Sequence, residues 1–327
     1  MALKTRHGAP GIMLIGLSAI GLFALVSVVA WRFGIEELPD PADPSLGGSD
    51  AAASFSQLTT GSVLDTARIV RLGELGPELP ESSGLAVSRA RPELLWTHND
   101  GDEGRLFAIR SDGTPVASIE VKGIDIDDWE DIDLARCPAD APDDRDCLYV
   151  GDVGDNDASR QRYSIDIVPE PDPEGGDEVE VLRRVWFRYP EGPADTEGLA
   201  VLDNGDALLL TKGNDGPSRL YRLPLGDEES DEVLDATLVG NVPVVVDTDR
   251  DRITAAAVSP DESILAIRNH HAVYLFDMDR PLGAPLLCEI GALQPQGEAL
   301  DFIQPSMLIL TSEQVEGRAP IVRLRCP

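Results

Sequence analysis

The stretch ESSGLAVSRARPELLWTHNDGDEGRLFAIR, residues 81–110, decides the fold, because it holds three short apolar runs separated by turns. The runs SGLAVS, LLWTHNDG and RLFAIR are rich in the aliphatic and aromatic residues that β-strands favour. Gly, Asp, Asn and Pro punctuate them, as in tight turns between neighbouring strands. From here to the end of the chain no long amphipathic pattern of period 3.6 competes with this reading.

The same order of strands recurs four more times along the chain. Its first strand reads EDIDLA from Glu130, EGLAVL from Glu197, TAAAVS from Thr254 and EALDFI from Glu298. Each is followed by a second and a third strand, and outer strands are visible as VASIEV, VEVLRRVWFRY, ATLVGNVPVVV and LLCEIGAL. Repeats of this length with four strands are typical of propeller blades. The sequence therefore predicts an all-β fold, a five-bladed β-propeller, with six blades as the alternative if the long second repeat contains two.

The last repeat runs out of chain after its third strand. We expect TARIVRLGEL, residues 66–75, to supply its fourth strand and so to close the ring. Closure of this kind removes sheet edges that would otherwise be exposed.

The N-terminal part predicts an exported chain. Residues 11–31 read GIMLIGLSAIGLFALVSVVAW, carry no charge and are long enough for one transmembrane helix, with Lys4 and Arg6 before them. The positive-inside rule then leaves residues 1–10 in the cytoplasm and the bulk of the chain on the periplasmic or extracellular side, anchored to the membrane by this helix. A cleaved signal peptide is the alternative. The Pro- and Gly-rich acidic residues 32–57 predict a disordered stem, and residues 58–327 the propeller.

The net charge and the cysteine pattern limit the classes of partner and metal that the protein is expected to bind. The net charge of −32 argues against nucleic acid as a partner. Cys137 and Cys147 bracket a short polar loop, so a disulfide that closes a hairpin is plausible, and Cys288 and Cys326 would then pair by elimination. Four cysteines allow three pairings, and the sequence alone does not choose between them. No CxxC motif or Cys/His cluster is present, which argues against zinc.

Aligning the repeats predicts a metal site. The first strands begin with oxygen-bearing residues, and in a propeller equivalent positions of the innermost strands lie at one depth around the axis. Three facing carboxylates repel one another, so either their pKa values rise or a cation lies between them. Oxygen ligands in loose geometry favour Ca²⁺ over Mg²⁺; hydrogen bonds to backbone groups or to water are the alternative. The predicted ligands are Ser83, Glu130, Glu197, Thr254 and Glu298.

The set ESSGLAVS, DWEDIDLA, DTEGLAVL, RITAAAVSP and QGEALDFI resembles the bacterial SdiA-regulated family of propellers. It is also similar to the five-bladed calcium-dependent apyrases and, more loosely, to esterase-like phytases. In the first two groups the inner strands present Ser, Glu, Glu, Ser and Glu in order, so Thr254 departs by one methyl group and keeps its hydroxyl. The resemblance implies a propeller with an axial metal. Its apyrase side would imply nucleotide hydrolysis, but the chain has TKGND where that pattern places phosphate-binding arginines.

Two functions follow from these patterns. We favour a binding or scaffold module at the cell envelope, with a central calcium ion and an unidentified protein or small-molecule ligand on the polar face of the disc. The alternative is a calcium-dependent phosphohydrolase, although no GxSxG, Walker A or HExxH motif is present. An enzyme would need His98, Asp152, Lys212 and Arg268 around one cleft above the metal. The candidate catalytic residues are His98, Asp100 and Asp152, and the candidate substrate-binding residues are Arg160, Lys212 and Arg268.

Overall fold

The computed structural model describes residues 68–101, 103–139, 141, 145–214, 216–226, 230 and 232–326. The chain divides into two units, and every described residue belongs to the second, Asp50–Pro327. The expected cytoplasmic terminus (1–10), membrane segment (11–31) and stem (32–57) lie outside the described residues. Within the described residues, no helix is both long and apolar enough to span a bilayer.

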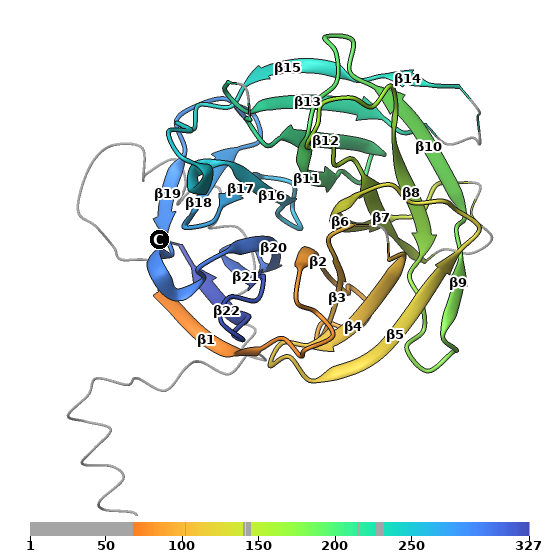
Figure 1. Cartoon of the computed structure of the whole chain (residues 1–327), viewed down its shortest axis with the longest axis vertical. Coiled ribbons are helices and arrows are strands. Elements are labelled where there is room, and N and C mark those ends of the chain that lie inside the picture. Colours follow the sequence, from red (N-terminus) through yellow and green to blue (C-terminus); the bar gives the residue numbers. More distant parts are fainter. Residues whose placement is uncertain are drawn as a thin grey trace, which may run out of the picture. The chain divides into compact units, whose positions relative to one another are not determined.

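Five sheets surround a common axis, each with its first strand innermost (Figure 1). The described part of the chain is therefore a five-bladed β-propeller. Each blade has four principal strands. Blade 1 contains β2 (Ser82–Val87), β3 (Leu94–Asn99), β4 (Arg105–Arg110) and β5 (Pro115–Lys122), and blade 2 contains β6 (Trp129–Arg136), β7 (Asp146–Asp152), β8 (Tyr163–Pro169) and β10 (Arg183–Arg188). Blade 3 contains β11 (Thr196–Val201), β12 (Asp206–Thr211), β13 (Arg219–Pro224) and β15 (Thr237–Asn241); blade 4 contains β16 (Ile253–Val258), β17 (Ile264–Asn269), β18 (Ala272–Asp277) and β19 (Leu286–Glu289); and blade 5 contains β20 (Gly297–Gln304), β21 (Met307–Ser312), β22 (Pro320–Arg325) and β1 (Arg68–Glu74).

The first described strand closes the ring, as expected from the sequence. Strand β1 pairs antiparallel with β22, from Arg68 opposite Arg325 to Glu74 opposite Pro320. The outer strand of the last blade thus comes from the start of the propeller, and the two ends of its sequence are joined by a hydrogen-bonded ladder (Figure 1).

Two short strands depart from the expected four-strand pattern. Strand β9 (Glu178–Glu180) pairs parallel with β5 of blade 1, and β14 (Leu234–Asp235) pairs parallel with β10 of blade 2. The run at 179–189, expected to be one outer strand, therefore splits. Its backbone changes sheets between two adjacent residues, because the Val181 amide donates to the Lys122 carbonyl and the Leu182 amide donates to the Ile167 carbonyl.

The apolar core lies between the blades. Five hydrophobic clusters are present in the described residues, one between each pair of neighbouring blades. Trp96 and Trp129, for example, pack in the cluster between blades 1 and 2 and are at most 1% exposed. Because every blade is buried on both faces, the positions of the inner strands around the axis are fixed by packing.

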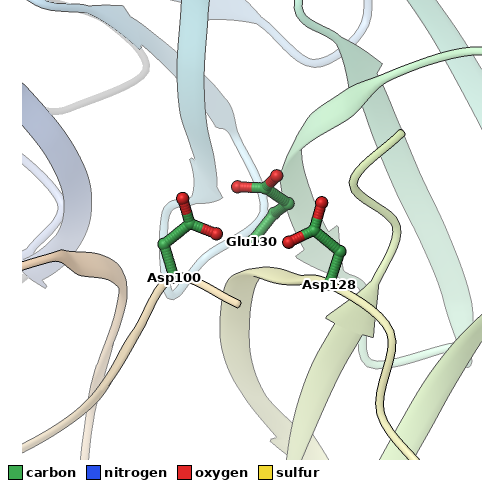
Figure 2. Close-up of side chains that lie close together, drawn as sticks. All are labelled: Asp100, Asp128 and Glu130. Carbon is green, nitrogen blue, oxygen red and sulfur yellow. The ribbon is translucent and has the colours of Figure 1, made fainter. Parts of the chain in front are cut away.

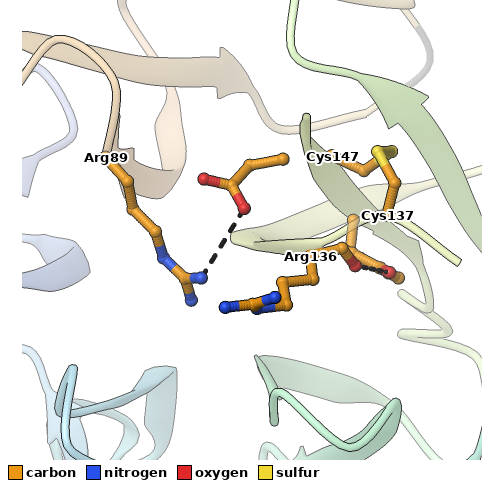
Figure 3. Close-up of a disulfide and its surroundings, with 6 residues drawn as sticks. Arg89, Arg136, Cys137 and Cys147 are labelled. Carbon is orange, nitrogen blue, oxygen red and sulfur yellow. Dashed lines mark hydrogen bonds and ion pairs between the residues drawn. A yellow bond between two sulfur atoms is a disulfide. The ribbon is translucent and has the colours of Figure 1, made fainter. Parts of the chain in front are cut away.

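Both disulfides of the expected pairing are present. Cys137 and Cys147 lie ten residues apart and join the strands β6 and β7 near the β6–β7 turn (Figure 3). Cys288 on β19 is bonded to Cys326, which follows β22, and this bridge connects blade 4 to blade 5. Arg89 of blade 1 forms an ion pair with Asp146, next to the first disulfide.

Candidate cation site at the propeller axis

The predicted ring residues occupy equivalent positions in the structure. Each is the second residue of its inner strand, and none is more than 6% exposed. In all five blades the pairing between the first and second strands is irregular at this point, so that the ring residue has no partner in the register. A β-bulge redirects a side chain that would otherwise follow the alternation of the strand. The residues are Ser83, Glu130, Glu197, Thr254 and Glu298.

Carboxylates from three blades gather at this end of the inner strands. Asp100 follows β3, Asp128 precedes β6, and Glu130 belongs to β6; their side chains face one another (Figure 2), and one oxygen of each lies within 4.8 Å of the others. Glu130 forms a second group of the same size with Asp195 and Glu197 of blade 3. We call these five residues the axial carboxylate cluster, in which Glu130 is the member common to both groups.

Glu130 is buried without a partner. In the described part of the chain, no hydrogen bond or ion pair to its carboxylate is present, and the residue is 3% exposed. Burial raises its pKa well above the ordinary value, and the charge of Glu197 raises it further. Gly154 lies against this side chain, since a Cβ built there would overlap the carboxylates of Glu130 and Asp128. A buried carboxylate without a donor is costly unless a proton or a cation joins it.

The third-blade half of the cluster has a cation of its own. Lys212 forms ion pairs with Glu197 and, at 3.7 Å, with Asp195. Asp195 is also bound by the Asp155 amide and by the Asn214 side chain, both at 2.8 Å. Burial raises the pKa of Glu197 to about 8, although the charge of Lys212 acts in the opposite direction. The other pair in the cluster, Asp100 of blade 1 with Asp128 of blade 2, has no basic side chain in ion-pair contact within the described residues.

The other ring residues have weaker attachments. Glu298 contacts His270 at 3.3 Å, and burial raises the pKa of Glu298 well above its usual value, with the charge of Glu197 adding to the effect. The Thr254 hydroxyl donates to the Gly297 carbonyl at 3.1 Å. The Ser83 hydroxyl has no hydrogen bond to the part of the chain described. Three oxygen-bearing side chains from blades 1, 4 and 5 thus complete the turn around the axis.

Most of the candidate catalytic and substrate-binding residues are used by the fold. His98 is fully buried against the Trp129 ring, and burial lowers its pKa to about 4. Arg268 is fully buried and donates to the carbonyls of Ala299 and Thr311. Of the four residues that an enzyme would need around one cleft, only Lys212 keeps a partly exposed side chain, at 22%. These contacts give no support to a phosphate-handling set.

Asp152 and Arg160 support the cluster indirectly. The Asp152 carboxylate accepts the backbone amides of Asp127 and Asp128, and Arg160 forms an ion pair with it at 2.9 Å. Arg160 also donates to the Gly154 carbonyl at 2.9 Å. The pair therefore holds the loop that carries Asp128. Of the six candidates, Asp100 belongs to the axial carboxylate cluster and Lys212 forms ion pairs with its carboxylates.

Sequence reasoning missed Asp128 and Asp195. Both lie two residues before a ring glutamate, in the motifs DWE and DTE. Positions two apart on an extended chain share a face, so the signal was present in the aligned stretches. It had the form of an acidic residue repeated at the same offset in blades 2 and 3.

Comparison with known proteins identifies no family for this chain. No model of a known protein family matches the chain, and a search of the curated proteins finds no match. Among solved structures, the PQQ-bound aldose sugar dehydrogenase from Streptomyces coelicolor is similar at 12% identity, over 81% of this chain and 99% of that chain, with a TM-score of 0.47. At this level the likeness carries no argument about cofactor or activity. Membership of the SdiA-regulated family stays a prediction.

Proposed function

We propose that the protein is an extracytoplasmic binding module that holds one calcium ion at the axis of its propeller. Glu130 carries the proposal, because it is buried, has no partner among the described residues, and belongs to both groups of close carboxylates. A single cation beside Glu130 would be within reach of ligands from blades 1, 2 and 3. The ring residues Ser83, Thr254 and Glu298 would supply oxygen from the remaining directions, directly or through water.

The chemistry of the donors favours a hard divalent cation. Every candidate ligand is an oxygen, and in the described part of the chain Lys212 is the one basic side chain in ion-pair contact with any of the five carboxylates. Oxygens that bind Ca²⁺ at about 2.4 Å can lie up to about 4.8 Å apart, whereas those around Mg²⁺ lie closer and in a strict octahedron. In both groups the oxygens lie within 4.8 Å of one another, which is compatible with their sharing one Ca²⁺.

A binding role agrees with the geometry better than hydrolysis does. His98 and Arg268 are enclosed by the blades, and Asp152 and Arg160 are paired with each other and with backbone groups. The ion would then hold the inner strands of several blades together and leave the face above it for a ligand. The anchor at residues 11–31 and the stem would place this face outside the cytoplasm.

Metal removal tests the proposal. We expect the purified full-length chain to contain about one calcium per molecule, and chelation followed by dialysis to lower its melting temperature. A ligand that binds only the folded state at a hundred times its Kd adds about 2.7 kcal/mol of stability. Glu130→Gln should abolish the calcium-dependent shift, while Glu289→Gln, on the outer strand β19, should retain it.

Two results would contradict the proposal. One is a melting temperature of the wild-type chain that does not respond to calcium after chelation. The other is calcium-dependent turnover of nucleotides or phosphate esters, which would replace a binding module by an enzyme.

A further inference from the structure

The one cation in ion-pair contact with the axial carboxylate cluster, within the described residues, belongs to the protein itself. Lys212 follows β12, and its ammonium contacts Glu197 and lies 3.7 Å from Asp195. Both partners belong to the group that Glu130 completes. The ammonium therefore shares two of the three carboxylates that a metal in this group would use.

The backbone of Lys212 is fixed by hydrogen bonds, while its side chain is partly exposed, at 22%. Its amide donates to the Asp195 carbonyl at 2.9 Å, and its carbonyl accepts the Ile253 amide at 3.2 Å. These bonds tie the residue to the loop before β11 and to the start of β16. Four methylene groups separate this fixed point from the ammonium, which can rotate away without any change in the backbone.

We propose that Lys212 is a tethered competitor of the axial metal ion, so that calcium binds only as the ammonium leaves Glu197 and Asp195. This inference rests on the proposed function. A monovalent ammonium and a divalent cation on the same oxygens repel each other, and their occupation of the site is mutually exclusive. The apparent affinity for the metal is then the intrinsic affinity multiplied by the fraction of molecules in which the ammonium has left the site.

The same arrangement preserves the site in the absence of metal. Without a positive charge, Glu197, Asp195 and Glu130 would repel one another within a buried region. The charge of Lys212 lowers the pKa of Glu197 and opposes the burial that raises it. Lys212 thus keeps the carboxylates in place for a metal while it weakens the binding of that metal.

Substitution of Lys212 separates the two roles. A hydrogen bond to a charged group contributes about 1.5–3 kcal/mol, which corresponds to about a tenfold to a hundredfold change in an equilibrium constant. We expect Lys212→Met to tighten calcium binding to the full-length chain by about this factor, measured by calorimetric titration, and to lower the melting temperature of the metal-free form. Lys212→Arg keeps the charge and should stay within about threefold of wild type. Lys122→Met is the matched control, since Lys122 pairs with Glu120 and Glu178 on the outer strands β5 and β9.

Amine labelling of the wild-type chain gives a readout that needs no variant. The chain has three lysines, Lys4, Lys122 and Lys212. Calcium should increase the labelling of Lys212 by an amine-reactive reagent several-fold, with Lys122 unchanged as the internal reference. Calcium binding that is equally tight in wild type and Lys212→Met, with constant labelling of Lys212, would overturn the inference and leave the proposed function intact. Absence of calcium binding in both proteins would overturn both.

Discussion

A single methyl group added at Gly154 should weaken metal binding and have little effect on the stability of the fold. A Cβ at this position would overlap Asp128 and Glu130, and in both cases the overlap involves the mobile end of the side chain. Gly154→Ala therefore displaces two carboxylates of the axial cluster without forcing the backbone apart. We expect calcium affinity to fall by about tenfold or more. The melting temperature of the metal-free protein should change by less than about 3 °C.

Gly283→Ala provides the control for this substitution. Gly283 lies between β18 and β19, away from the axis, and a Cβ there would meet only Arg280 of its own turn. Its calcium affinity should equal that of wild type. Unchanged calcium binding in Gly154→Ala would show that Asp128 and Glu130 are not ligands.

The strands and the ring positions could be predicted from the sequence, whereas the bulges and the change of sheet within one expected strand could not. The stretches beginning at Glu130, Glu197 and Glu298 identify three inner strands, because apolar residues and turns recur at one spacing. The bulge at each ring residue depends on the register with a second strand, and register is a property of the assembled sheet. The sheet change between Val181 and Leu182 likewise depends on two neighbouring blades that compete for one segment.

The role of a side chain could be predicted from the sequence only where the fold does not bury it or occupy it with hydrogen bonds. Arg268 has the charge that phosphate recognition requires, but its guanidinium donates hydrogen bonds to carbonyls of blade 5. Asp128 was overlooked, although its offset from Glu130 equals that of Asp195 from Glu197. Composition and spacing give the available chemistry, whereas burial and hydrogen bonding select the groups that remain available.

One buried carboxylate connects three inner strands. Asp131 on β6 is fully buried and accepts the amides of Leu199 on β11 at 2.8 Å and Ala256 on β16 at 3.3 Å, together with that of Ile132 at 2.9 Å. Asp131→Ala leaves these donors unsatisfied, and each buried unsatisfied group costs about 1–3 kcal/mol. We expect the free energy of unfolding, measured in urea, to fall by about 3 kcal/mol or more.

An exposed carboxylate provides the comparison. Asp112 accepts one amide, that of Thr114 within the same turn, at 2.9 Å. Asp112→Ala should cost no more than about 1 kcal/mol. Similar losses for Asp131→Ala and Asp112→Ala would mean that the axial hydrogen bonds do not hold blades 2, 3 and 4 together.

At the scale of the whole molecule, the ring closes between the first described strand and the last, and a disulfide supports that closure. The Cys288–Cys326 bond spans 38 residues, whereas the Cys137–Cys147 bond spans 10 residues within one hairpin. Chain-entropy arguments give a stabilisation of about 4 kcal/mol for the longer loop and about 3 kcal/mol for the shorter one. Replacement of Cys288 and Cys326 by alanine should therefore lower the free energy of unfolding more than replacement of Cys137 and Cys147.

The location of the loss should differ as well. Without the Cys288–Cys326 bond, the pairing of β22 with β1 is released from blade 4, so amide hydrogen exchange should accelerate in these two strands and stay slow in β6 and β7. The Cys137→Ala/Cys147→Ala variant should leave β1 and β22 protected, because its loop lies wholly inside blade 2. Uniform acceleration over all five blades in the Cys288→Ala/Cys326→Ala variant would instead indicate that the ring opens as one cooperative unit, with its stability shared equally among the blades.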